Sequence, residues 1–382
     1  MNVQAAFDFS PLSGLLLIGG LLALGPALWV WFKNRAASTG RRVQAVRVLT
    51  LFLTFDLILF GAFTRLTDSG LGCPDWPGCY GNASPLGATD QITQAQTAMP
   101  TGPVTHAKAW IEMLHRYIAS GVGFLILLLT VKSWHDWLTQ RRNVVKLNHA
   151  AGWPRLSTLT LFWVCLQGAF GAWTVTMKLF PLIVTLHLLG ALVLLVLLGL
   201  QVAQHAAQKS QSRAMPAGLP GLLVASLLLL FMQIALGGWV SSNYAVLVCS
   251  DFPTCQGHWW PEMDFRAGFE LWRGLGVTGS GELLSFTALT AIHVAHRLMA
   301  YVVLALLMVL AWQLNRFASW RLQARVLAGL IGLQLATGLS NVVLGWPMLS
   351  ALLHTGGAAA LVMTLIWTLS STSVLKLRPL YG

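Results

Sequence analysis

Charged residues are scarce in this sequence of 382 residues. Asp, Glu, Lys and Arg together make up 9% of it, against about 25% in an average soluble protein, and so few charges cannot cover the surface of a soluble domain. Hydrophobic residues make up 56%. The composition therefore excludes a soluble globular protein and indicates an integral membrane protein.

Acidic residues are the rarer charge type, because 12 Asp and Glu stand against 24 Lys and Arg for a net charge of +12. A nucleic-acid-binding protein would gather basic and aromatic residues on a polar domain, and this sequence has no such cluster. Most of its basic residues instead follow alternate apolar segments, which is typical of cytoplasmic loops in membrane proteins. We expect contact with the lipid bilayer and none with nucleic acid.

Apolar runs of about the 20 residues that a membrane-spanning helix needs occur nine times. They lie at 11–32, 48–66, 109–131, 156–177, 181–203, 219–240, 285–312, 323–345 and 350–372. The first run follows Asp8 and precedes basic residues, which is the reverse of a cleaved signal peptide, so we interpret it as an uncleaved anchor. The sequence thus predicts an all-α polytopic membrane protein with nine spans.

The basic residues also predict the orientation of the chain. They cluster after the first, third, fifth, seventh and ninth spans, for example at Arg41, Arg42 and Arg47. The positive-inside rule places these loops in the cytoplasm, with the N-terminus outside and the C-terminus inside. We therefore expect the long loops at 67–108 and 241–284 on the periplasmic face of the cell inner membrane.

Cysteine is rare as well, with five residues. Four of them form two pairs, Cys73 with Cys79 and Cys249 with Cys255, and both segments read C-x-D-x-P-x-C in a predicted outer loop. An oxidising compartment favours disulfides in such short loops. We therefore predict two disulfides, with a redox-active dithiol of the same spacing as the alternative.

The matching cysteine loops indicate an internal repeat. The pattern [E/H]-x-x-H-R occurs once in each half, and Gln167 with His187 has the same spacing as Gln334 with His354. We expect an anchor helix and basic loop at 1–45, a first four-helix bundle at 46–208 and a second at 209–382. Because each bundle would hold an even number of spans, the two should be pseudosymmetric about an axis along the membrane normal.

A finer repeat, Q-x-x-x-G, lies on the fourth, sixth and eighth spans and begins at Gln167, Gln233 and Gln334. A small residue lets two helices approach closely and a Gln can hydrogen-bond across the contact, so we interpret this motif as helix packing. The second span only approximates it, with Asp56 and Gly61. An intramembrane carboxylate is a functional candidate, although pairing of Asp56 with a neighbouring helix explains it equally well.

Four histidines lie one to two turns into spans that enter from the outer face, namely His115, His187, His296 and His354. The rise of a helix places them at a similar depth. A single membrane histidine is usually a packing residue, but four at repeat-related positions suit a metal held from opposite sides. No cysteine or carboxylate cluster shares that depth, as zinc would require, whereas bis-histidine haem brings its other four ligands with the porphyrin.

Residues beside these histidines carry further signals. Arg116 and Arg297 each follow a histidine directly and are candidates to pair with haem propionates or to reach lipid headgroups. One turn before the histidine stands Glu112 in the first half and His293 in the second, which breaks the repeat. Glu112 is a candidate proton acceptor or stabiliser of a developing cation, and His293 a hydrogen-bonding residue behind a ligand.

Several motifs together resemble the haem A synthase family, the haem O oxidases needed for haem–copper terminal oxidases. They are Thr64-Arg65-Leu66-Thr67-Asp68-Ser69-Gly70-Leu71, Cys73-Pro74-Asp75-Trp76-Pro77, Glu112-x-x-His115-Arg116, His187, His296-Arg297 and His354. The resemblance covers roughly residues 46–372 and leaves the first span outside. It implies haem B as a cofactor ligated by His296 and His354, and a substrate haem held by His115 and His187.

The resemblance also implies a reaction, the oxidation of the C8 methyl group of haem O to a formyl group by successive hydroxylations, with haem B passing electrons on. Glu112 would be the essential acidic group. If both axial positions of the substrate iron are taken, either one ligand leaves or oxidation occurs at the porphyrin edge. In the second case Glu112 would stabilise a cationic methyl group or direct water to it. Haem O synthase, the protohaem farnesyltransferase, is a candidate partner.

Two other classes of protein share parts of this pattern. A dihaem electron carrier or quinol oxidoreductase would use the same four histidines with both haems permanently bound. A transporter would share the repeat, but the sequence shows no broken midplane helix and no ion-binding carboxylate beyond Asp56.

Overall fold

Residues 10–142, 154–207 and 215–372 are described by the computed structural model of this protein. Within them, nine helices are long and apolar enough to cross a membrane, which confirms the predicted spans. They are α1 (Ser10–Lys33), α2 (Thr39–Leu66), α4 (His106–Arg142), α5 (Arg155–Thr176), α6 (Pro181–Ala207), α7 (Leu219–Ser242), α9 (Phe286–Asn315), α10 (Arg321–Val343) and α11 (Met348–Ser370).

Short helices interrupt the loops between the spans. They are η1 (Pro85–Ala88), α3 (Thr89–Ala98), α8 (Phe265–Gly268) and η3 (Ala318–Trp320). The described residues contain isolated β-bridges but no β-strand. The all-α fold is therefore confirmed for this part of the chain, and the protein is a multi-pass membrane protein.

The need to satisfy polar groups in a bilayer explains why the spans are helical. Hydrocarbon offers no hydrogen-bond partner, so each backbone N–H must bind a carbonyl of its own helix. Threonine hydroxyls in the spans do the same, because Thr54, Thr130 and Thr364 each donate to the carbonyl four residues earlier at 2.8 Å. At the start of α9, the hydroxyl of Ser285 accepts from the N–H of Ala288 and caps the helix.

The chain forms two compact units, one up to Leu179 and one from Phe180 onward. The first unit holds α1 to α5 and the second holds α6 to α11. The assignment of bundles to 46–208 and 209–382 and their pseudosymmetry stay predictions.

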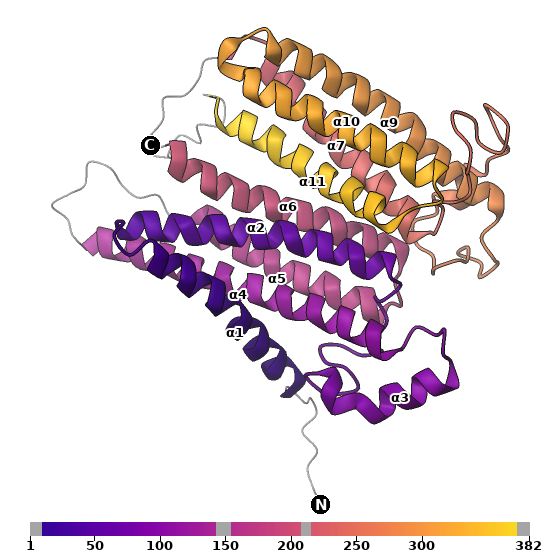
Figure 1. Cartoon of the computed structure of the whole chain (residues 1–382), viewed down its shortest axis with the longest axis horizontal. Helices are drawn as coiled ribbons and strands as arrows, with labels where there is room; N and C mark the ends of the chain where they lie inside the picture. Colours follow the sequence, from indigo (N-terminus) through magenta and orange to yellow (C-terminus); the bar gives the residue numbers. More distant parts are fainter. Residues whose placement is uncertain (1–9, 143–153, 208–214, 373–382) are drawn as a thin grey trace, which may run out of the picture. The chain divides into compact units, whose positions relative to one another are not determined.

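In the first unit, α4 contacts α1, α2 and α5, and Figure 1 shows α1 running beside α2 and α4. The backbones of α1 and α4 approach each other closely at their contact. A Cβ atom added at Gly19 would lie 2.6 Å from the carbonyl oxygen of Tyr117, and one at Gly121 would lie 2.8 Å from that of Gly19. The N-terminal helix is therefore closely packed on α4, because small residues stand on both sides.

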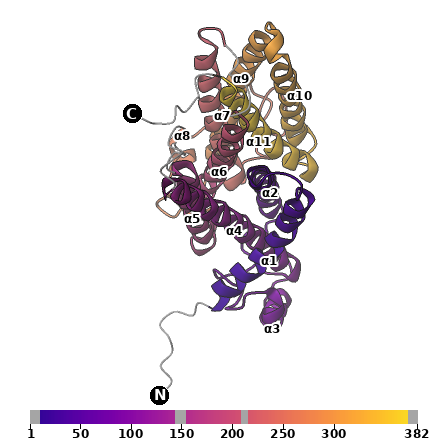
Figure 2. The same ribbon diagram turned by 90° about the vertical axis from the view of Figure 1, so that its left-hand side faces the viewer.

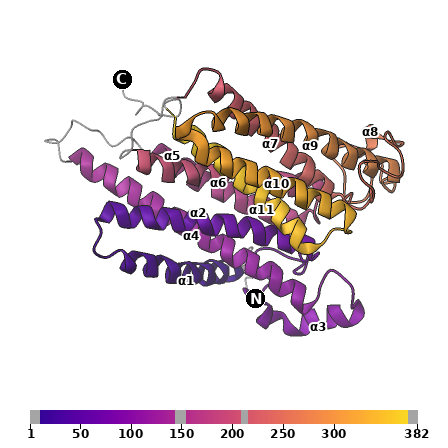
Figure 3. The same cartoon turned by 45° about the horizontal axis from the view of Figure 1, so that its top comes forward.

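In the second unit, α7 contacts α6, α9 and α11, and α10 contacts α9 and α11; Figures 2 and 3 show these helices side by side. The loop between α7 and α9 lies on this group through α8. The indole N–H of Trp239 donates to the carbonyl of Gly268 at 2.9 Å. The same indole ring is contacted by the guanidinium of Arg273, 5.5 Å from the ring centroid.

Candidate functional site

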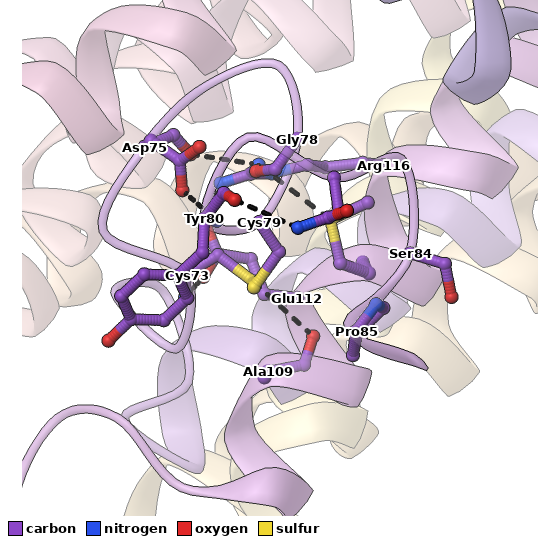
Figure 4. The surroundings of a disulfide bond; sticks show 12 residues. Cys73, Asp75, Gly78, Cys79, Tyr80, Ser84, Pro85, Ala109, Glu112 and Arg116 are labelled. Atoms are coloured by element: carbon purple, nitrogen blue, oxygen red, sulfur yellow. Dashed lines mark hydrogen bonds and ion pairs between the residues drawn. A yellow bond between two sulfur atoms is a disulfide. The ribbon is translucent and has the colours of Figure 1, made fainter. Parts of the chain in front are cut away.

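The first predicted disulfide, Cys73–Cys79, is present and closes a loop around the carboxylate of Asp75. The two oxygens of Asp75 accept from the backbone N–H groups of Tyr80 at 2.6 Å and Gly81 at 2.7 Å. Gly81 has a φ of +72°, which an L side chain rarely adopts. The short loop is thus held by a covalent bond at its base and by one carboxylate inside it (Figure 4).

The second predicted disulfide, Cys249–Cys255, is also present, and its loop repeats these hydrogen bonds. Asp251 accepts from the backbone N–H groups of Gln256 at 2.7 Å and Gly257 at 3.0 Å. The hydroxyl of Thr254 donates to the same carboxylate, and these hydrogen bonds, with that of Thr254 the strongest, lower the pKa of Asp251 to about 2. The repeat seen in the two sequences therefore extends to the loop geometry.

Glu112 and Arg116 hold the first loop on α4. One carboxylate oxygen of Glu112 accepts from the backbone N–H of Cys73 at 2.7 Å, and the other pairs with the guanidinium of Arg116. Arg116 also donates to three loop carbonyls, those of Asp75 at 3.0 Å, Pro77 at 3.1 Å and Gly78 at 2.5 Å. Both side chains are buried, 4% and 8% exposed, so the predicted acidic residue lies at the junction of loop and helix (Figure 4).

Arg297 holds the second loop on α9 in the same way. Its guanidinium donates to the carbonyls of Asp251 at 3.0 Å, Thr254 at 2.9 Å and Cys249 at 2.8 Å. His293 stands where the first half has Glu112, and its Nδ1 hydrogen-bonds the carbonyl of Ala245 at 2.7 Å. We did not predict from the sequence that the two arginines hold the loops. The feature that could have indicated this role is the His-Arg pair, which recurs in both halves together with the cysteine loop.

Three glycines face the predicted ligand histidines and leave room for the imidazole rings. A Cβ atom added at Gly61, Gly237 or Gly338 would approach the Cε1 atom of a histidine within 3.1 to 3.2 Å. The histidines are, in the same order, His115, His296 and His354. The close approach predicted for the glycines is therefore confirmed at these three contacts, and it centres on the histidines.

Two of the three glutamines of the same motif bind histidines from the neighbouring helix. The amide of Gln233 donates to the carbonyl of His296 at 3.2 Å, and that of Gln334 donates to the carbonyl of His354 at 2.9 Å. The amide nitrogen of Gln233 also lies 3.1 Å and 3.4 Å from the two ring nitrogens of His296. The hydrogen bond that we predicted across the helix contact is thus confirmed for Gln233 and Gln334. It is not formed by Gln167, whose side-chain amide has no hydrogen-bond partner among the described residues.

His296 on α9 and His354 on α11 both lie in the second unit, where each of these two helices contacts α7 and α10. His115 lies in the first unit, where its ring stacks on Phe60 with centroids 6.2 Å apart. His187 lies on α6 of the second unit and is half-buried, and its buried Nδ1 has no hydrogen-bond partner within the described ranges. The pairing of His115 with His187 stays a prediction.

The donor set of the described residues fits haem better than a metal held by protein ligands alone. No three His, Cys, Asp or Glu side chains in this part of the chain converge as a metal site, whereas zinc would need three or four. Haem needs two axial ligands at most, and His296 with His354 are the candidates to provide them. The Nδ1 of His354 hydrogen-bonds the hydroxyl of Thr337 at 3.0 Å, so Nε2 is the ring nitrogen left for iron.

Two further charged residues have unusual positions: Asp56 lies within a membrane span, and Arg273 is buried in a loop. Asp56 is exposed on α2 and forms no ion pair with any residue that the structure describes. Arg273, in the loop between α8 and α9, is 2% exposed and donates to the side chain of Asn243 at 2.7 Å. Burial lowers the pKa of Arg273 from its usual value. We did not identify Arg273 from the sequence, because nothing in a loop pattern marks one arginine as buried.

Among the described residues, nine apolar helices, two disulfide loops and four half-buried, repeat-related histidines define a polytopic membrane protein with a candidate ligand set for haem. The model of the COX15-CtaA family, described as cytochrome oxidase assembly protein, matches residues 44–366. The chain belongs to this family.

Individual relatives cover nearly the same part of the chain. A heme A synthase of Shewanella oneidensis is 40% identical over 323 residues, which is 83% of this chain and 93% of the relative. Heme A synthases of Halalkalibacterium halodurans and Sphingopyxis alaskensis are 25% and 28% identical, each over 86% of this chain and over 94% and 90% of the relative. The helix α1 lies outside the residues that the family model matches.

Proposed function

We propose that this protein is a haem A synthase, an oxidoreductase that converts the C8 methyl group of haem O to a formyl group by successive hydroxylations. The observation that carries the proposal is the 40% identity, over most of both chains, with a protein named heme A synthase. The residues of the E-x-x-H-R motif and the three further histidines support it, because they supply a carboxylate beside candidate haem ligands.

His296 and His354 would hold a resident haem B, and His115 and His187 would hold the substrate haem O. Haem B supplies a one-electron redox centre when it is bound. The glycines at positions 237 and 338 make room for the two imidazoles of the resident site, and Gln233 and Gln334 bind the helix carbonyls behind them. These contacts support a site that is formed before the cofactor enters.

Glu112 would act on the substrate through its charge. Its carboxylate accepts from the N–H of Cys73 and pairs with Arg116, so its position is set from two sides before substrate binds. A carboxylate fixed in this way can stabilise positive charge on the methyl group or orient a water molecule toward it. His293 replaces the carboxylate in the second half, which favours the first half as the reacting one.

The pattern of basic residues supports a cellular location and a membrane orientation for this protein. The positive-inside rule favours an N-terminus outside and a C-terminus in the cytoplasm of a cell inner membrane, with both disulfide loops on the periplasmic face. An oxidising compartment there accounts for the disulfides. Haem O synthase is the candidate partner that would deliver the substrate.

Extraction of pigment from the purified full-length protein tests the proposal. We expect haem B together with haem O or haem A. Haem B alone would favour a dihaem electron carrier and contradict the proposal, and a protein without a Soret band would contradict both.

A further inference from the structure

One position of the repeat distinguishes the helix that faces His354 from the other three. The position is the residue directly before the glycine of the packing motif. It is apolar in α2, α5 and α7, and it is a threonine in α10. These residues are Phe60, Phe170, Leu236 and Thr337. At this position of the motif, a hydroxyl therefore stands beside His354.

The hydroxyl of Thr337 joins two helices at this point. Its oxygen lies 3.0 Å from Nδ1 of His354 on α11, and the side chain is 6% exposed. The same hydroxyl lies 2.7 Å from the carbonyl oxygen of Leu333 in its own helix. Ser350 of α11 donates in turn to the backbone carbonyl of Thr337 at 3.0 Å. Two hydrogen bonds thus tie α11 to Thr337 of α10.

The direction of these hydrogen bonds decides where the proton of the imidazole lies. A hydroxyl has a single hydrogen, and the short contact to the carbonyl of Leu333 takes it, because a carbonyl oxygen can only accept. The oxygen of Thr337 is then an acceptor toward His354. Nδ1 of His354 must donate to it, and in a neutral imidazole the lone pair that binds a metal then stands on Nε2.

We infer that Thr337 is a positioning residue for His354, which fixes the ring in the tautomer and orientation needed to bind the iron of the resident haem. This inference rests on the proposed function, since it takes His354 as an axial ligand. A hydrogen bond from the outer nitrogen of a ligating histidine makes the inner nitrogen a stronger donor. Thr337 therefore stabilises the ferric state and lowers the reduction potential of this haem.

The second ligand of the same haem is held differently. His296 faces Leu236 in place of the threonine, and its ring contacts the amide of Gln233 at 3.1 Å and 3.4 Å. An amide nitrogen donates hydrogen bonds and does not accept the proton of Nδ1. The two axial ligands are thus unequal, with His354 the more firmly oriented one.

Three single variants of the full-length protein test this inference. Thr337→Val keeps the size and β-branched shape but removes the acceptor, and Thr337→Ser restores a hydroxyl. Thr364→Val is the matched control, because Thr364 is equally buried but donates only to its own helix at Ala360. The readouts are the midpoint potential of the resident haem and the fraction of its iron that gives a low-spin bis-histidine resonance spectrum.

We expect Thr337→Val to raise the midpoint potential and lower the low-spin fraction, whereas Thr337→Ser and Thr364→Val match the native protein. A Thr337→Val protein with native potential and spectrum would overturn the inference, as would a Thr337→Ser protein that behaves like Thr337→Val. If His354→Ala keeps the native low-spin spectrum, the ligand assignment itself fails. The result with His354→Ala can be told apart from the results with the Thr337 variants, because it would contradict the proposed haem ligand itself and not only the role of Thr337.

Discussion

The backbone N–H of Cys73 donates a 2.7 Å hydrogen bond to the carboxylate of Glu112. The two residues are 39 positions apart in the sequence, and the bond joins a disulfide loop to the helix that also carries His115. Arg116 completes the junction by pairing with Glu112 and donating to three carbonyls of the loop. The loop is therefore part of the support of the proposed reacting site.

Replacing Glu112 by Gln keeps the size of the side chain but removes the charge that Arg116 neutralises. Breaking a buried ion pair by removing one partner costs about 3–5 kcal/mol, so we expect a lower Tm. We also expect haem O or a partly oxidised haem to accumulate while the resident haem B stays bound, because His296 and His354 lie on other helices.

The measurement is pigment extraction and separation from the purified variant, with Glu262→Gln as the control because Glu262 is exposed in the loop between α7 and α8. A normal yield of haem A from Glu112→Gln would remove Glu112 from the proposed mechanism.

Replacing Arg297 by Lys should loosen the second disulfide loop. The guanidinium uses two nitrogens to reach three carbonyls, and the single ammonium of Lys cannot span them. We expect a loss of about 1–3 kcal/mol of stability. Limited proteolysis of the loop and thermal unfolding would measure it, with the exposed Arg266→Lys as control; equal behaviour of the two variants would contradict the role of Arg297.

Replacing Gly338 by Val should expel the resident haem. Its Cβ would stand 3.2 Å from Cε1 of His354, so the ring must move, and overpacking of this kind costs about 1–3 kcal/mol. Gly329→Val on the same helix is the control, because nothing lies within 4 Å of a Cβ atom there. The Soret absorbance per protein should fall in Gly338→Val alone; an equal fall in both variants would point to a general effect on α10.

The second disulfide loop should resist acid. The folded-state pKa of Asp251 is about 2, below its ordinary value of 3.8, so the carboxylate contributes stability above about pH 4 and loses it as the pH falls through about 2. Thermal unfolding of the native protein and of Asp251→Asn, followed from pH 7 to pH 2, checks this. The difference in Tm should shrink between pH 4 and pH 2; a constant difference would contradict it.

Much of the site could be predicted from residue type and spacing. The two disulfides followed from C-x-D-x-P-x-C in outer loops, and the contacts of Gly237 and Gly338 with neighbouring helices followed from Q-x-x-x-G. The partners of Arg116 and Arg297 could not be predicted this way. We weighed haem propionates and headgroups, whereas the structure shows both guanidiniums bound to backbone carbonyls of the loops, which leave no mark in a sequence.

The sequence by itself determined the nine membrane spans, the repeat and the candidate ligands, because span length, charge asymmetry and residue spacing are local properties of the chain. Only the tertiary structure decided which groups meet across helices. The hydroxyl of Thr337 reaches Nδ1 of His354, and the N–H of Cys73 reaches Glu112. Such contacts depend on how helices pack and how loops fold onto them, since a hydrogen bond requires its two atoms within about 3 Å in a suitable direction.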